Sequence, residues 1–363
     1  MNRVDPFTRT PGVAGEAFIN MHYADVIIDQ FSSNASSRYI YKIVGLRGSG
    51  KSVEYRNVIN TMAAKEGWLV YTLSSAGDPT TTLIAKLSRE KFIDEKKTIT
   101  SITSHGSVEA GAVIAKGSAD VGVTRTTEEN PLYYSEEATL SEMIQKANDK
   151  GYKVLVGIDD IAKTDAMVKF LSIWGAMLLD DRKKIYFVCT GLAKNVEDFA
   201  NEANLTFFKR SDSVEINALN MYDIAAMYVK LLNVEEREAV RLAKFTRGYA
   251  YAYQVLGSLY FQKYPEETLD DLMPSFDRIL FQDSYDLIWK TLTGGEKDLV
   301  RRIACSDTGK VSEIKAQMES PSGFSSLRSR LVQKHLLDTS RRGYISVELP
   351  RFREYIELWH DEE

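Results

Sequence analysis

The sequence has few of the residues that build disulfides and soft-metal sites. Its 363 residues include only two cysteines, Cys189 and Cys305, and four scattered histidines. Neither residue type occurs at the spacings that zinc ligands take. The wide separation of the two cysteines argues against a disulfide scaffold and fits a reducing compartment.

Long apolar runs and a strong excess of one charge are also missing. The sequence contains no run of about 18 apolar residues that would be long enough to span a membrane. The first residues, MNRVDPFTRTPG, lack the apolar segment of a signal peptide. With 46 basic and 51 acidic side chains the net charge is −5, so contact with a nucleic acid would need a local basic patch. We expect a cytoplasmic protein of two or three domains with no membrane contact.

What the sequence does contain is an alternation of strand-like and helical patterns. We expect strands at 39–44, 68–74, 153–160 and 183–191, with helices between them, which is typical of a parallel sheet with helices on both faces. From Met221 to about Leu292 the apolar spacing is helical throughout. Residues 98–127 are rich in small residues and favour a β-hairpin or a flexible insertion.

A glycine-rich stretch, GLRGSGKS at residues 45–52, fits the pattern G-x-x-x-x-G-K-[ST] and lies between a strand and a helix. Glycines let successive backbone N–H groups turn toward an anion, and the helix N-terminus adds its dipole. Lys51 should reach the outer phosphates of a nucleotide, and the Ser52 hydroxyl should bind Mg²⁺. The predicted nucleotide-binding residues are Gly45, Arg47, Gly48, Ser49, Gly50, Lys51 and Ser52.

Such a loop needs a carboxylate from a neighbouring strand, and KVLVGIDD ends in two. We predict that Asp159 is the second Mg²⁺ ligand and that Asp160 is the base that activates water. Thr190 ends the strand KKIYFVCTG, and it is either a sensor of the γ-phosphate or an ordinary strand-end hydroxyl. Arg210 could contact a nucleotide in trans and Arg247 could cover its base, although a solvated arginine is the default.

The order of GLRGSGKS, KVLVGIDD, KKIYFVCTGL and a helical segment with TRGYAYAYQVLG resembles the origin-recognition-complex-like AAA+ ATPases of prokaryotes, which border the STAND regulators. The resemblance covers nearly the whole chain. It implies an N-terminal arm (residues 1–32), an ATPase core (33–218), a helical lid (219–291) and a winged helix-turn-helix tail (292–363). It also implies ATP and Mg²⁺ as cofactors.

The sequence departs from the family pattern at three places. Asp160 stands where glutamate is usual, and its shorter side chain predicts slow turnover. The arm lacks the Gly-Arg pair that is common before the first helix, so contacts to the adenine stay open. The stretch at 98–127 is longer than a minimal core needs.

The tail carries a modest basic excess. Residues 294–350 contain ten lysines and arginines against seven acidic residues, which leaves +3. A winged helix places one helix in the major groove and its wing on the phosphates. The predicted DNA contacts are Arg328, Arg330, Lys334, Arg341 and Arg342.

We therefore predict a slow Mg·ATP-dependent ATPase whose nucleotide state controls a tail that binds duplex DNA. An alternative is a nucleotide switch or scaffold that does not hydrolyse ATP and whose tail docks a protein. A third reading, a P-loop kinase that acts on a small molecule, is disfavoured because the sequence shows no acceptor pocket. Oligomerisation stays open.

Overall fold

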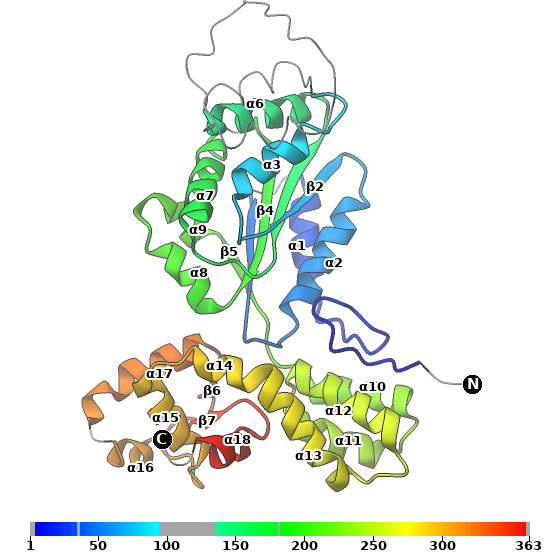
Figure 1. Cartoon of the computed structure of the whole chain (residues 1–363), viewed down its shortest axis with the longest axis vertical. Coiled ribbons are helices and arrows are strands. Elements are labelled where there is room, and N and C mark those ends of the chain that lie inside the picture. The colour runs from blue at the N-terminus through cyan, green and yellow to red at the C-terminus, as the bar shows by residue number, and fades with distance from the viewer. Residues whose placement is uncertain (1–3, 35–36, 94–134, 181, 319, 361–363) are drawn as a thin grey trace, which may run out of the picture.

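The computed structural model describes residues 4–34, 37–93, 135–180, 182–318 and 320–360 (Figure 1). The insertion predicted at 98–127 lies outside the described residues. Five strands form one sheet in the order β2-β3-β4-β1-β5, and every pairing is parallel, as the alternating pattern predicted. The strands are β1 (Ile40–Val44), β2 (Trp68–Leu73), β3 (Lys153–Ile158), β4 (Ile185–Gly191) and β5 (Asp212–Glu215).

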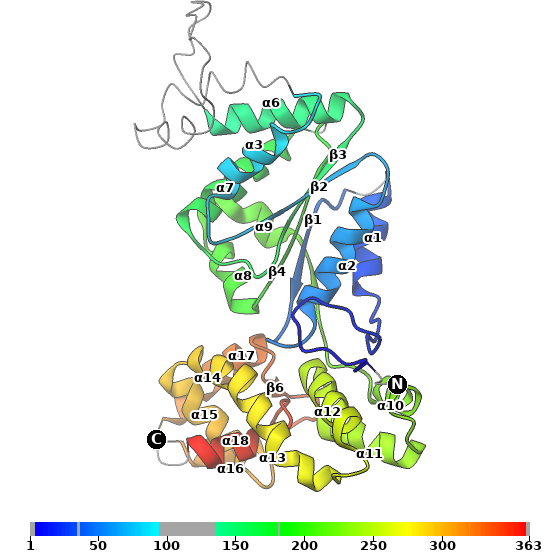
Figure 2. The same cartoon turned by 45° about the vertical axis from the view of Figure 1, so that its right-hand side comes forward.

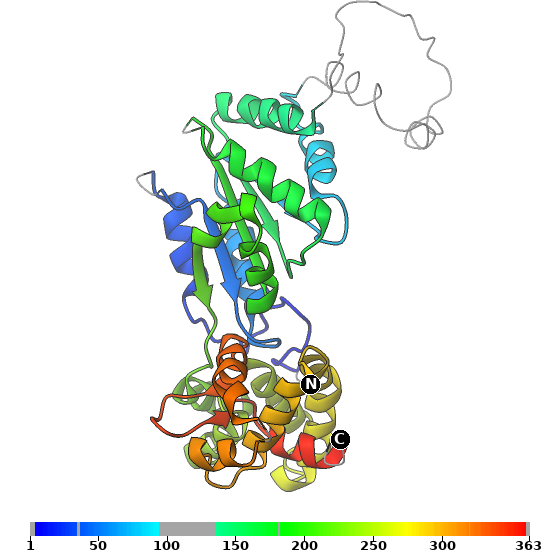
Figure 3. The same ribbon diagram turned by 90° about the vertical axis from the view of Figure 1, so that its left-hand side faces the viewer.

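Helices cover both faces of the sheet (Figures 1 and 3). On one face, α1 (Tyr23–Ser32) and α2 (Lys51–Ala63) pack on alternate residues of β1 and β4. The remaining residues of β3 and β4 face a second core, which explains why both strands read as continuous apolar runs. The helices on this side are α3 (Pro79–Leu87), α6 (Glu136–Asp149), α7 (Asp165–Met177), α8 (Ala193–Ala200) and α9 (Thr206–Arg210).

The edge strand β5 was not predicted from the sequence. It reads DSVE and alternates between half-buried and exposed side chains. A short, polar edge strand has no apolar run to reveal it. Its pairing with β1 places β1 in the interior of the sheet.

The lid is helical, as predicted. It contains α10 (Met221–Leu232), α11 (Glu236–Thr246), α12 (Ala250–Lys263) and α13 (Leu269–Leu280). A π-helical segment, η2 (Phe281–Tyr285), and α14 (Asp286–Lys290) continue α13 without a break.

The tail contains three helices followed by a two-stranded antiparallel hairpin, which is consistent with the predicted winged helix. These elements are α15 (Gly294–Ala304), α16 (Val311–Ala316), α17 (Phe324–Gln333), β6 (Leu337–Asp338) and β7 (Ser346–Val347). A further helix, α18 (Phe352–Trp359), was not predicted. Its buried residues Phe352, Tyr355 and Ile356 pack into the core that the lid and the tail share.

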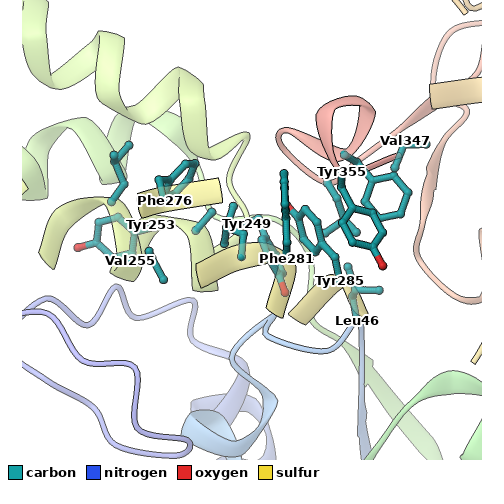
Figure 4. Close-up of a cluster of buried hydrophobic side chains, with 14 of the residues drawn as sticks. Leu46, Tyr249, Tyr253, Val255, Phe276, Phe281, Tyr285, Val347 and Tyr355 are labelled. Atoms are coloured by element: carbon teal, nitrogen blue, oxygen red, sulfur yellow. The ribbon is translucent and has the colours of Figure 1, made fainter. Parts of the chain in front are cut away.

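That shared core also takes in parts of the chain from far upstream. Leu46, at the start of the glycine-rich loop, packs in the cluster that holds Tyr249, Tyr285 and Tyr355 (Figure 4). Phe7 of the arm belongs to the same cluster. The loop that follows β1 therefore shares one hydrophobic core with the lid and the tail.

The described part of the N-terminal arm contacts both the core and the lid. Its helix α1 packs on the core, whereas residues 4–21 lie along the lid helix α12 (Figure 2). Thr8 N–H donates to Gln254 at 2.8 Å, and the Tyr253 hydroxyl donates to the carbonyl of Ala17 at 2.9 Å. The arm thus ties the core to the lid. In the described part of the chain no helix has the length and apolar character to cross a membrane.

Candidate functional site

The glycine-rich loop (residues 45–50) connects the carboxyl end of β1 to the first turn of α2. Gly48 and Gly50 have φ values of 76° and 103°, which favour glycine, and Gly50 is the N-cap of α2. The Ser49 Oγ is buried and has no hydrogen-bond partner among the described residues. A loop with an unsatisfied polar atom next to a helix N-terminus fits an anion.

Lys51 lies inside this loop. Its Nζ donates a hydrogen bond to the carbonyl of Leu46 at 2.9 Å. Burial lowers the pKa of Lys51 to about 8, and the nearby carboxylates of Asp160 and Asp159 oppose this shift. The ammonium group is therefore partly desolvated, and a bound phosphate would stabilise its charge.

Ser52, Asp159 and Thr190 are joined by hydrogen bonds, although three different elements supply them. The Ser52 hydroxyl donates to Asp159 Oδ1 at 3.1 Å, and the Thr190 hydroxyl donates to the same oxygen at 2.6 Å. The two predicted metal ligands are thus neighbours, and both offer the hard oxygen atoms that Mg²⁺ prefers. Among the described residues no three His, Cys, Asp or Glu side chains gather as a metal site, so water and phosphate oxygens would complete the coordination of Mg²⁺.

The neighbouring Asp160 is held in an unusual backbone conformation. Its φ is 55°, its N–H donates to Thr190 Oγ1 at 2.7 Å, and its carbonyl accepts from Ser75 at 3.1 Å. A left-handed backbone costs a non-glycine residue about 1 kcal/mol. Because two hydrogen bonds hold this conformation, the carboxylate leaves β3 in a defined direction, on the exposed side of the site.

The structure places Thr190 in contact with both carboxylate residues. Thr190 is 1% exposed as a residue, and its hydroxyl donates its single proton to Asp159. This geometry supports a positioning role for Thr190 and leaves no proton for direct contact with a γ-phosphate.

Two predicted arginines lie away from the loop. Arg210 precedes β5, where Asp212 pairs with Tyr41 near the amino end of β1. The loop follows the opposite, carboxyl end of β1, so Arg210 does not reach it within one chain. The Arg247 guanidinium donates to the carbonyl of Val347 in β7 at 3.0 Å, because the left-handed backbone at Arg247 turns the end of α11 toward the tail. Arg247 therefore joins the lid to the tail in this structure.

The sequence analysis missed two lid residues that contact the loop directly. The Tyr249 hydroxyl donates to the carbonyl of Arg47 at 2.7 Å, and Tyr251 N–H donates to the carbonyl of Gly48 at 3.1 Å. The sequence analysis assigned no role to the tyrosines of TRGYAYAYQVLG, and the structure shows that a third one, Tyr253, anchors the arm at Ala17. No local pattern indicates a contact between residues about 200 positions apart.

A cavity of about 540 Å³ lies beside this contact. Residues of the arm, Tyr251 of α12 and Asp283 of η2 line it. The Tyr251 hydroxyl donates to Asp283 Oδ2 at 2.7 Å. The cavity therefore borders the lid residue that binds the loop.

In the tail, one of the predicted DNA contacts, Lys334, has an acidic partner within the chain. Lys334 Nζ lies 2.7 Å from Glu296 Oε2, and that carboxylate is 1% exposed. The lysine therefore neutralises a buried acid. Arg330, Arg341 and Arg342 are exposed, and Arg341 stacks 3.8 Å above the ring of Tyr344. Arg328 is half-buried on α17, the helix on the side of the tail that faces the core (Figures 1 and 3).

The whole chain is similar to solved structures of origin-recognition proteins. The ORC2 protein of Aeropyrum pernix, in its ADPNP-ADP complexes, matches with a TM-score of 0.53 and 12% identity, over 98% of this chain and 95% of that chain. The fold is that of an ORC-like AAA+ ATPase. Cdc6p from Pyrobaculum aerophilum matches with a TM-score of 0.45 and 13% identity, over 96% of this chain and 98% of that chain.

A STAND ATPase with a tetratricopeptide-repeat sensor from Pyrococcus horikoshii also matches, with a TM-score of 0.38 and 15% identity. The match covers 100% of this chain but 44% of that one. The profile of a domain of unknown function, DUF8462, matches residues 282–356, which comprise most of the tail and the end of the lid. No curated protein matches the sequence.

Proposed function

We propose that this chain is a slow Mg·ATP-dependent ATPase whose nucleotide state controls a winged-helix tail. The observation that carries the proposal is the cluster of Ser52, Asp159 and Thr190, joined by hydrogen bonds beside a glycine-rich loop that is followed by the half-buried Lys51. The ADPNP and ADP named for the Aeropyrum pernix ORC2 protein, which shares the fold, support the nucleotide assignment.

Each polar residue of the site has a task in this proposal. Ser52 and Asp159 would hold Mg²⁺, which supplies charge neutralisation at the phosphates when it is bound. Lys51 would exchange the carbonyl of Leu46 for an outer phosphate oxygen. Asp160 would orient the attacking water and accept its proton, while Thr190 keeps both aspartates in place.

Slow turnover follows from the length of the side chain of Asp160. A glutamate in its place would reach one methylene further toward the attacking water. The aspartate also leaves β3 from a fixed, left-handed backbone. A general base must come within hydrogen-bond reach of the proton that it removes, so a short and rigid base keeps the rate low.

For the tail, we propose duplex DNA as the partner. The exposed Arg330, Arg341 and Arg342 are the contacts, and Arg328 lies on the same helix, α17. Because α17 faces the core in this structure (Figures 1 and 3), access to it depends on how the lid holds the tail. The alternative is a switch without turnover whose tail docks a protein.

Titration calorimetry with ATP and Mg²⁺ tests the proposal. The wild-type chain should bind, and Lys51→Ala should lose binding, because the substitution removes the cation of the loop. Lys65→Ala is a matched control, since Lys65 binds Ser32 at 2.5 Å at the other end of α2. Unchanged affinity in Lys51→Ala would refute the nucleotide site. ATP turnover with and without duplex DNA, at two salt concentrations, separates DNA binding from protein docking.

A further inference from the structure

The N-terminus of α12 contacts the outer side of the glycine-rich loop. Tyr249, the N-cap residue, is 6% exposed and donates its hydroxyl proton to the carbonyl of Arg47 at 2.7 Å. Tyr251 N–H, one of the N–H groups that a helix leaves unpaired in its first turn, donates to the carbonyl of Gly48 at 3.1 Å. The loop thus caps a lid helix.

These two contacts determine which way the N–H groups of the loop point. In a trans peptide the carbonyl and the following N–H point in opposite directions. With the carbonyls of Arg47 and Gly48 turned to the lid, the N–H groups of Gly48 and Ser49 are turned to the inner side. Ser49 N–H does lie there, since it donates to Leu46 O at 3.1 Å. Lys51 Nζ donates to the same oxygen.

The contact leaves no room for the loop to shift. A Cβ at Gly48 would lie 2.3 Å from the Tyr249 hydroxyl oxygen and 3.0 Å from Tyr251 Cβ. The φ of 76° at Gly48 also favours glycine. Lid and loop are therefore packed closely enough for a displacement of one to require a displacement of the other.

The Tyr249 hydroxyl has a second partner on the way to the tail. It lies 2.7 Å from Ser284 Oγ, and because its own proton is donated to Arg47, Ser284 is the donor. Ser284 is 2% exposed and belongs to the π-helical segment η2, a type of distortion that is frequent at functional sites. The next residue, Tyr285, donates to the carbonyl of Pro350, just before α18.

We propose that Tyr249 is a positioning residue that sets the peptide planes of the phosphate-binding loop and couples its occupancy to the tail through Ser284 and Tyr285. The inference rests on the proposed ATP site. A phosphate oxygen that accepts the N–H group of Gly48 polarises the peptide between Arg47 and Gly48 and makes the carbonyl of Arg47 a better acceptor. The bond from Tyr249 becomes stronger, and by linkage a docked lid raises the affinity for the nucleotide.

The test compares two tyrosines of the same segment. Tyr249→Phe removes the hydroxyl at the loop, and Tyr253→Phe, its matched control, removes a buried hydroxyl that binds Ala17 in the arm. Tyr249→Phe should weaken ATP binding about 3- to 10-fold, the equivalent of one hydrogen bond. Tyr253→Phe should bind ATP within about twofold of wild type, with a similar loss of Tm in both variants.

The coupling to the tail needs its own measurement. Hydrogen exchange of residues 345–350 should slow when ATP binds to the wild type, and this protection should be lost in Tyr249→Phe. Ser284→Ala keeps the bond between Tyr249 and Arg47, so it should still bind ATP but lose the protection. It also keeps the test decisive if Tyr249→Phe fails to fold.

The outcomes separate this inference from the proposed function. A wild-type chain that does not bind ATP refutes the proposed function, and the inference falls with it. If the wild type binds and Lys51→Ala does not, the site is real. Wild-type affinity and wild-type protection in Tyr249→Phe would then overturn the inference alone, and so would full protection in Ser284→Ala.

Discussion

Thr190 Oγ1 donates to Asp159 Oδ1 over 2.6 Å and accepts the N–H of Asp160 over 2.7 Å. One hydroxyl at the end of β4 therefore holds two consecutive aspartates at the end of β3. The parallel register of the two strands places Cys189 beside Ile158, so that both strands end at the same edge of the sheet. The geometry of both the predicted metal ligand and the predicted base therefore depends on Thr190.

Removing the Thr190 hydroxyl should lower the rate of ATP turnover more than the affinity for the nucleotide. Thr190→Val leaves the N–H of Asp160 unpaired in a left-handed backbone and frees the Asp159 carboxylate to rotate. We expect ATP turnover to fall about 10- to 100-fold, as for other residues that orient metal ligands, with little change in nucleotide affinity without Mg²⁺. Thr190→Ser should restore most of the rate. Equal rates in Val and Ser variants would contradict the positioning role.

A longer side chain at position 160, the proposed general base, should raise the rate of ATP hydrolysis. Asp160→Glu brings the carboxylate one methylene closer to the attacking water, and we expect a several-fold rise in the steady-state rate of phosphate release. Asp160→Asn is the matched control, because asparagine tolerates the left-handed backbone but cannot accept a proton. It should lower the rate about 100-fold. Turnover that is negligible in all three proteins would favour the switch without hydrolysis.

The half-buried Lys51 should destabilise the protein without nucleotide in a pH-dependent way. The pKa of Lys51 is lowered from 10.5 to about 8 in the folded chain, so between these values the unfolded chain binds more protons and stability rises with pH. At pH 7 the full cost of the buried charge is present. Lys51→Met should therefore be about 1–3 kcal/mol more stable at pH 7 without nucleotide.

Thermal melts of both proteins from pH 6.5 to 10 measure this difference. The advantage of Lys51→Met should shrink as the pH rises above 8. Addition of Mg·ATP should reverse the order, because only the wild type gains stability from binding. A stability advantage of Lys51→Met that does not change with pH would contradict the lowered pKa of Lys51.

Substitutions of the basic residues of the tail should have two different effects, one on DNA binding and the other on stability. Replacing Arg330 and Arg342 with alanine should weaken DNA binding and lower the slope of log affinity against log salt by about two, with no change in Tm. Lys334→Met should lower the free energy of unfolding by about 3 kcal/mol, because it leaves Glu296 buried without its partner. Fluorescence anisotropy with duplex DNA at several salt concentrations, together with chemical denaturation, distinguishes the two.

The sequence predicted the parts of the site that local patterns encode. GLRGSGKS directly follows β1, and KVLVGIDD consists of β3 and the two aspartates after it, so Lys51, Ser52 and Asp159 could be predicted as site residues without coordinates. The structure brings Ser52 and Asp159 within 3.1 Å. The parallel sheet followed from the same alternation of strands and helices.

Other features depend on residues that are distant in the sequence. Tyr249 contacts Arg47 across about 200 positions, and Lys334 is paired with Glu296 in another helix. No spacing within either segment reports these contacts, and a basic residue on a predicted recognition helix looks the same whether it is paired or free. The helix α18 was detectable, since Phe352, Tyr355, Ile356 and Trp359 follow helical spacing.

The unbroken helical run from α13 through η2 to α14 leads from the lid to the start of the tail. It spans residues 269–290, a length of roughly 33 Å at the rise of an α-helix. The contact from Tyr249 reaches this run at Ser284, six residues before its end, so a rotation of about 10° there would move that end by roughly 1.5 Å. A change at the loop would thus reach the first residues of the tail as a displacement of the order of an ångström.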